Sequence, residues 1–288
     1  MVDVNTALQA CAYNDRKRKS GGSAKDDDSK SRRIEPFDPV AYAKKETADM
    51  FSMWLVIIYG LGIAALLRYV MMPTMTGPDA ILYLIPLLLC ATVPSLHKLL
   101  IPNKYYEQYT KGNWFRACML FIFSWLALSF ALVNPPLADI APPTTAGGLD
   151  IELTDGVVDA TWKGSEYTIG LDQGSVDVVL GFAVRDNVDA ETAMLSGEIS
   201  YRGEIIQTIS SGTVISHTDE MATFDTVGNW TRGVKVAPHE MDIGLAWNLG
   251  TLSPGEYTVH IVLSEQGEPW ENVWDKTYTI IIAQTSTA

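Results

Sequence analysis

The sequence predicts a membrane α plus all-β protein, in which three transmembrane helices precede an extracytoplasmic antiparallel β-sandwich. Three long apolar runs lie between residues 50 and 133. From residue 149 onward apolar and polar residues alternate, which is the period of half-buried strands. Lysine and arginine are concentrated in alternate connecting segments, as expected of a chain that crosses a membrane three times.

Each apolar run is long enough to cross a bilayer. The first run, residues 50–67, has 18 residues and no charge. At about 1.5 Å per residue it covers most of the hydrocarbon core, with Arg68 reaching out to the interface at its end. Pro86 and Pro94 interrupt the second run, and proline is tolerated in membrane spans, usually as a kink. We expect the three spans at about 50–72, 80–98 and 114–133.

The basic residues predict the orientation. They gather in the N-terminal tail, residues 1–49, and in the second loop, which has three lysines between residues 98 and 111. The first loop, 73–79, and residues 134–148 carry none. Because cytoplasmic flanks are enriched in lysine and arginine, we expect the N-terminus in the cytoplasm and the chain after residue 134 outside it. The predicted location is the cell membrane, with the lipid bilayer around the spans.

The chain is expected to have four parts. Residues 1–49 form a cytoplasmic tail, mostly disordered because dense mixed charge cannot offset the entropy of folding, and without an apolar run of signal-peptide length. Near its end, Asp38 and Pro39 are typical of a helix cap and a first helical residue. The other parts are the transmembrane region 50–133, a Pro/Gly linker at 134–148 and the β domain 149–288.

The C-terminal part has the pattern of short strands separated by turns. Apolar residues alternate over four stretches, 176–184, 195–201, 243–249 and 257–263. Many such strands with regular turn signals predict a sandwich or a barrel. In the last stretch, we expect one set of alternate residues to face the core and the intervening Thr258 and His260 to face out. The inward set is Tyr257, Val259, Ile261 and Leu263.

One segment resembles a known class of domain. Residues 252–263 (LSPGEYTVHIVL) are similar to the penultimate strand of immunoglobulin-like and fibronectin-III-like domains, in which a Pro-Gly turn precedes a tyrosine-bearing strand. Residues 276–283 would then be the last strand. Tyr257 is similar to the tyrosine of a tyrosine corner, whose hydroxyl bonds back to the backbone. The resemblance implies an Ig-like sandwich and no particular activity, because such sandwiches have unrelated functions. The membrane half resembles no family.

The predicted outer domain is strongly acidic. Residues 149–288 hold 22 acidic and 6 basic residues, a formal net charge of −16. Such a surface repels nucleic acid and anionic head groups, so we expect no nucleic-acid partner. The three cysteines, Cys11, Cys90 and Cys118, all lie outside this part, so no disulfide framework is expected in it. That usage is more typical of archaeal or bacterial ectodomains than of small animal ones.

No catalytic, cofactor-binding or metal-binding residue is predicted, because no motif for such chemistry is present. Histidines stand beside carboxylates at 217–220 and 239–242, but the spacing matches no closed metal site and we expect surface loops. Asn229 begins an Asn-Trp-Thr sequon and is a candidate glycosylation site. The aromatic stretch 270–274 would suit carbohydrate stacking, although tryptophan in a β domain is more often core.

These features predict a multi-pass membrane-anchored binding or structural protein, a subunit of a membrane or cell-envelope complex that presents the acidic sandwich outside. Three spans exceed what a tether needs, which favours packing against a membrane-protein partner. Two alternatives stay open: an accessory subunit of a transporter or translocation machine, and a membrane-tethered enzyme or carbohydrate-binding module. The spans lack mid-membrane charges, unlike those of most transporters. No cofactor is expected, enzymatic activity is the less favoured interpretation, and the oligomeric state stays open.

Overall fold

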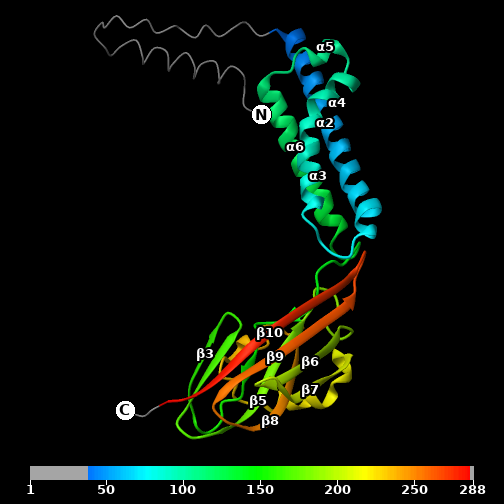
Figure 1. Cartoon of the computed structure of the whole chain (residues 1–288). Helices are drawn as coiled ribbons and strands as arrows, with labels where there is room; N and C mark the ends of the chain where they lie inside the picture. Colours follow the sequence, from blue (N-terminus) through cyan, green and yellow to red (C-terminus); the bar gives the residue numbers. More distant parts are fainter. Residues whose placement is uncertain (1–37, 286–288) are drawn as a thin grey trace, which may run out of the picture. The chain divides into compact units, whose positions relative to one another are not determined.

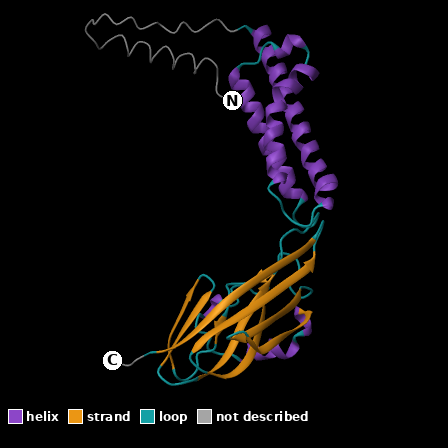
Figure 2. Ribbon diagram, viewed as in Figure 1, coloured by secondary structure: helices purple, strands orange, loops and turns teal. Residues whose placement is uncertain are grey.

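The structure of the protein is a computed structural model that describes residues 38–285. Its helices are concentrated in the N-terminal half, and its strands begin after residue 143 (Figures 1 and 2). The predictions for the N-terminal tail, including its disorder, its basic cluster and Cys11, concern residues that lie outside the described range.

Three helices are long and apolar enough to cross a membrane, and they run over residues 39–74, 81–100 and 111–132. The first comprises α2 (Pro39–Leu66), a π-helical turn (Leu67–Met71) and a 3-10 turn (Met72–Thr74). Asp38 caps it as predicted, because its carboxylate accepts hydrogen bonds from the backbone N–H of Val40 at 2.9 Å and of Ala41 at 3.3 Å.

The second and third helices differ in regularity. The second is divided into α3 (Ile81–Leu89), a 3-10 turn (Cys90–Thr92) and α4 (Val93–Leu100), with Pro86 inside α3 and a second proline at the start of α4. Proline removes a backbone donor, which accounts for the interruption. A short helix, α5 (Asn103–Tyr106), precedes the continuous α6 (Lys111–Leu132).

The helices pack around a few small and aromatic side chains. Val56, Val93 and Phe121 are completely buried. A Cβ at Gly60 would lie 3.1 Å from the carbonyl oxygen of Phe121, so glycine at this position lets α2 and α6 approach closely. Arg68 does not reach out as predicted: it is 3% exposed, and its guanidinium donates to the carbonyl of Leu132 and pairs with Glu268 at 2.9 Å. The carbonyl of Leu132 and the carboxylate of Glu268 replace the water that would otherwise solvate the buried guanidinium of Arg68.

The β-rich domain contains two sheets. The smaller sheet is centred on β5 (Val176–Arg185), which pairs antiparallel with β1 (Thr144–Thr145), β2 (Asp150–Ile151) and β8 (Ile243–Leu252). The larger sheet has, in spatial order, β3 (Val157–Lys163), β4 (Glu166–Leu171), β10 (Glu271–Gln284), β9 (Gly255–Gln266), β6 (Met194–Tyr201) and β7 (Glu204–Thr213). Figure 1 shows β9 and β10 side by side.

One pair departs from the predicted antiparallel arrangement. β10 runs parallel to β4, with Thr279 opposite Glu166. A parallel pair needs a long connection, and these two strands are separated by most of the domain's sequence.

Both sheets contribute to one hydrophobic core, which contains Phe182 and Leu245 from the smaller sheet and Ile199 and Ile280 from the larger. The predicted register of β9 is confirmed. The residues expected to face inward are at most 4% exposed, while Thr258 and His260 are only half-buried; the inward set is Tyr257, Val259, Ile261 and Leu263.

Two segments differ from the predicted pattern. The stretch 134–148, expected to be a linker, contributes β1 to the smaller sheet. A helix, α7 (Thr218–Thr226), occupies part of a region expected to be a loop, between two 3-10 turns at Val214–Ser216 and Gly233–Lys235. A short, largely polar helix has no long apolar stripe, so hydrophobic periodicity could not reveal it.

Residues 134–288, expressed alone, are expected to form a stable β protein. The core cluster lies entirely between residues 149 and 282, and a segment of this size buries enough apolar surface to fold without crosslinks. The measurement is a thermal melt followed by circular dichroism. A cooperative transition from a strand-dominated spectrum is expected, and a mainly helical spectrum or a non-cooperative melt would contradict it.

Candidate metal centre

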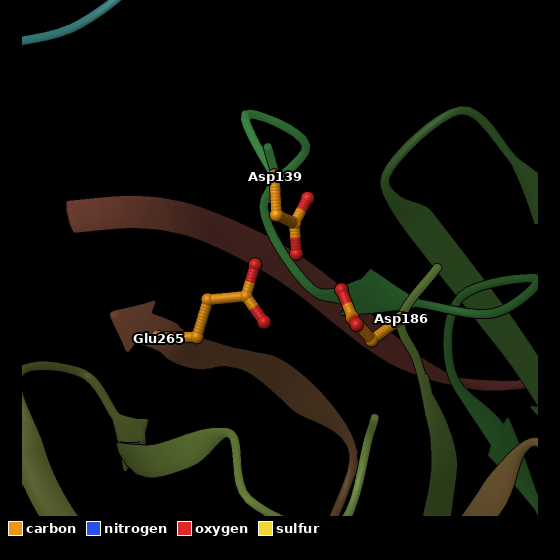
Figure 3. Close-up of side chains that lie close together, drawn as sticks. All are labelled: Asp139, Asp186 and Glu265. Carbon is orange, nitrogen blue, oxygen red and sulfur yellow. The ribbon is translucent and has the colours of Figure 1, made fainter. Parts of the chain in front are cut away.

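Three carboxylates from separate parts of the chain converge in the β-rich domain (Figure 3). Asp139 lies between α6 and β1, Asp186 directly follows β5, and Glu265 is near the end of β9. One oxygen from each lies within 4.8 Å of the others, and all three residues are half-buried. Figure 3 shows the three carboxylate groups pointing toward one another.

Strand pairing explains the convergence. An isolated bridge between Asp139 and Glu268 holds the chain beside the end of β9, with the N–H of Glu268 donating to the carbonyl of Asp139 at 2.8 Å. β1 then pairs with the end of β5, where Thr144 is opposite Arg185. The bridge brings Asp139 to Glu265, and the pairing of β1 brings it to Asp186.

Backbone and amide donors fix one oxygen of each carboxylate. Asp139 Oδ1 accepts from the N–H of Ala141 and from Asn187 Nδ2, at 3.2 and 3.1 Å. Asp186 Oδ2 accepts from two successive backbone N–H groups, those of residues 188 and 189, at 2.6 and 2.8 Å. Asp186 Oδ1 is buried and has no hydrogen-bond partner.

A buried asparagine contacts two members of the cluster. Asn272 is the second residue of β10, lies opposite Glu265 in the sheet and is 3% exposed. Its Nδ2 lies 3.0 Å from Glu265 Oε1 and 3.1 Å from the carbonyl oxygen of Asp139. Its Oδ1 is buried without a partner. An unpaired buried oxygen costs free energy unless a donor or a cation meets it.

The electrostatics of the cluster are unfavourable to three separate negative charges. Burial, then the charges of Asp186 and Asp139 and a hydrogen bond from protonated Glu265 to Asp186, raise the pKa of Glu265 to about 7, although the hydrogen bond from Asn272 opposes the shift. Over residues 38–285, the ion pairs involve other carboxylates; Arg185, adjacent to the cluster in sequence, pairs with Asp242 at 2.7 Å. Chemically, an oxygen-only donor set matches hard cations such as Ca²⁺ or Mg²⁺.

The histidine segments singled out in the sequence do not join this cluster. His217 is not in a surface loop: it is 4% exposed at the start of α7, with Nδ1 2.9 Å from the carbonyl of Thr213 and Nε2 3.0 Å from that of Ser210. A short 3-10 turn buries it, which the sequence did not indicate. His239 is exposed, as expected, and its N–H donates to Asp242.

The other sequence candidates lie elsewhere. Asn229 is exposed, while Thr231 of the same sequon donates its hydroxyl to the buried Asp150. Trp270 is 6% exposed and Trp274 packs partly against the core, so this stretch does not present two open rings for carbohydrate stacking.

No sequence pattern points to Asp139, Asp186 and Glu265, because no two of them are near one another in the chain. Only the strand register brings them together. A comparison with protein-family models finds no match to this chain, and a comparison with curated proteins finds no relative.

Proposed function

We propose that this chain is a multi-pass membrane-anchored binding or structural protein, a subunit of a membrane or cell-envelope complex. The proposal rests on one observation: the same chain contains three apolar helices of membrane length and a β domain with its own hydrophobic core. The acidic domain would be presented outside the cytoplasm, where its charge suits a basic partner.

The helices have apolar surface available for neighbours. Only 28%, 17% and 22% of the apolar windows of the three helices are buried within the protein, so most side chains can meet lipid or another protein's helices. The second helix presents Leu84, Leu87 and Leu88, each at least half exposed. One helix would suffice as an anchor, so the additional surface supports a helix-packing role.

The β domain supports an Ig-like assignment as part of this proposal. Tyr257 donates its hydroxyl to the carbonyl of Ser253 at 2.8 Å, four residues upstream, as a tyrosine corner does. The two sheets with a shared core also agree with it. Sandwiches of this kind often bind partners, but the fold alone names none.

Affinity purification from gently solubilised membranes tests the subunit proposal. We expect stable co-purification of at least one further membrane or envelope protein that remains associated after size-exclusion chromatography. A lone monodisperse protein would argue against it. Recovery of channel or transporter subunits would favour the alternative, an accessory role in transport, for which the outward-facing helix surfaces are equally suited.

Labelling of intact cells tests the orientation. In a cysteine-free background, Met241→Cys in the β domain and Gln108→Cys in the second loop both introduce an exposed thiol. An impermeant maleimide is expected to label the Met241→Cys variant directly and the Gln108→Cys variant only after permeabilisation, because lysines flank the second loop. The opposite pattern would reverse the proposed topology.

A further inference from the structure

We propose that Asp139, Asp186 and Glu265, with the buried Asn272 beside them, form a Ca²⁺ site in the β-rich domain. This proposal does not depend on the membrane-subunit proposal, because all four residues belong to the part of the chain that follows the last apolar helix. It rests on the closeness of the carboxylate oxygens, on two buried oxygens without a donor and on charge.

The three oxygens lie close enough together to share one calcium ion. Ca²⁺ binds oxygen at about 2.3–2.6 Å, so two ligands on opposite sides of the ion lie roughly 4.6–5.2 Å apart. The three carboxylates offer oxygens that are mutually within 4.8 Å. Mg²⁺ binds oxygen at about 2.0–2.1 Å, demands near-octahedral geometry and gives up its water reluctantly, so three carboxylates from separate segments suit the more adaptable shell of Ca²⁺ better. Ca²⁺ takes 6–8 oxygen ligands, and water would complete the shell.

Two buried oxygens without a hydrogen-bond donor, Asn272 Oδ1 and Asp186 Oδ1, are the independent evidence for a ligand. Asn272 is 3% exposed and its side chain faces the cluster, with Nδ2 3.0 Å from Glu265 Oε1. Burying an amide whose oxygen meets no donor is unfavourable, and Asp186 Oδ1 is a second buried oxygen that meets no donor while Glu265 is ionised. A cation bound by the carboxylates would satisfy Asp186 Oδ1, and the Asn272 amide, whose Nδ2 donates to Glu265 Oε1, would hold one of the ligands in place.

The negative charge of the cluster would also be balanced by a bound cation. Among residues 38–285, the ion pairs of Arg68, Arg116, Arg185 and His260 all go to other carboxylates. Three carboxylates held at this distance repel one another. A divalent cation converts that repulsion into attraction, and it would join the segment at residue 139 to the ends of β5 and β9.

The test is calcium titration of the full chain in mild detergent after treatment with EDTA. We expect one Ca²⁺ per chain by isothermal titration calorimetry, with half-saturation at about 0.1–1 mM, the range of extracellular calcium modules. At ten times that concentration, mass action predicts an increase of about 3–5 °C in melting temperature. An equal concentration of MgCl₂ is expected to produce a much smaller increase.

Variants separate calcium binding from structural damage. Glu265→Gln and Asp186→Asn keep the side-chain shape and remove one charge each. In EDTA, Glu265→Gln should melt at or above the wild-type temperature, because repulsion is relieved, and it should lose the calcium-dependent increase. Glu256→Gln is the matched control, since Glu256 is an exposed residue of the same strand, and it should respond to calcium as the wild type does.

Three results would overturn the proposal. These are the absence of any calcium-dependent heat or melting shift in the wild type at 10-fold the expected half-saturation concentration, an equal response to MgCl₂, and an undiminished calcium response in both Glu265→Gln and Asp186→Asn. If the wild type did not respond to calcium, the three carboxylates would be held together by shared protons and not by a bound ion.

Discussion

Replacing Asp150 with alanine is expected to lower the free energy of unfolding of the β domain by about 3–5 kcal/mol. Asp150 is fully buried in β2. Its carboxylate accepts from the N–H of Ile151 at 2.9 Å, the hydroxyl of Tyr167 at 3.0 Å and the N–H of Arg232 at 2.8 Å. The hydroxyl of Thr231 also donates to it. Alanine leaves the N–H groups of Ile151 and Arg232 without this acceptor and the hydroxyls of Tyr167 and Thr231 with only each other, and each orphaned donor costs about 1–3 kcal/mol.

The loss would affect more than one element. Arg232 also donates from its guanidinium to the carbonyls of Gly147 and Leu149, both at 2.7 Å, and lies over the ring of Trp162 at 4.7 Å. Asp150 therefore holds the segment after Trp230 against β2 and the start of the domain. Burial raises the pKa of Tyr167, so its hydroxyl stays protonated and remains a donor, for which Asp150 and the hydroxyl of Thr231 are the partners.

Urea unfolding of residues 134–288 measures the effect. Asp155→Ala is the matched control, because Asp155 is exposed in the turn after β2 and should change stability by only about 0.5 kcal/mol. Asp150→Asn is expected to lose less stability than Asp150→Ala and more than Asp155→Ala, since the amide keeps one acceptor oxygen. If Asp150→Ala were no more damaging than Asp155→Ala, the hydrogen-bonded arrangement around residue 150 would be wrong.

The sequence predicted the elements that depend on local periodicity. The three apolar runs became helices of membrane length, and the period-two stretches at 176–184 and 257–263 became β5 and β9. Both results follow from the direct relation between side-chain period and a buried face. The cap at Asp38 was predicted for a similar reason, because it depends on residues next to it in the chain.

Features that depend on distant contacts could not be predicted. Asp150 and Asp186 looked like two among many acidic residues, yet the first is fully buried and the second has a buried unpaired oxygen. Arg68 was expected at the membrane surface because a charge at the end of an apolar run usually reaches water. Its actual partners, Leu132 and Glu268, are distant in sequence, and no local rule identifies them. The parallel pairing of β4 with β10 also joins segments that are distant in sequence, so no local pattern could predict it.

Replacing Ile261 with alanine is the second change expected to have a large effect, about 2–5 kcal/mol of lost stability. Ile261 is 0% exposed in the middle of β9, within the core that both sheets share. β9 is an interior strand of the larger sheet, paired with β6 on one side and β10 on the other. The neighbouring strands restrict backbone movement, so a cavity left by the side chain cannot collapse easily.

Thr258 on the same strand provides the matched comparison. It is half-buried on the opposite face, where it lies between Ser200 of β6 and Thr279 of β10. Thr258→Ala removes a β-branched side chain from a polar row and should cost only about 0.5–1 kcal/mol. Both variants leave the backbone pairing intact, so urea melts of residues 134–288 compare side-chain burial alone. If Thr258→Ala were the more destabilising change, β9 would be out of register by one residue. The alternate residues of the strand, including Thr258 and His260, would then face the core in place of Tyr257, Val259, Ile261 and Leu263.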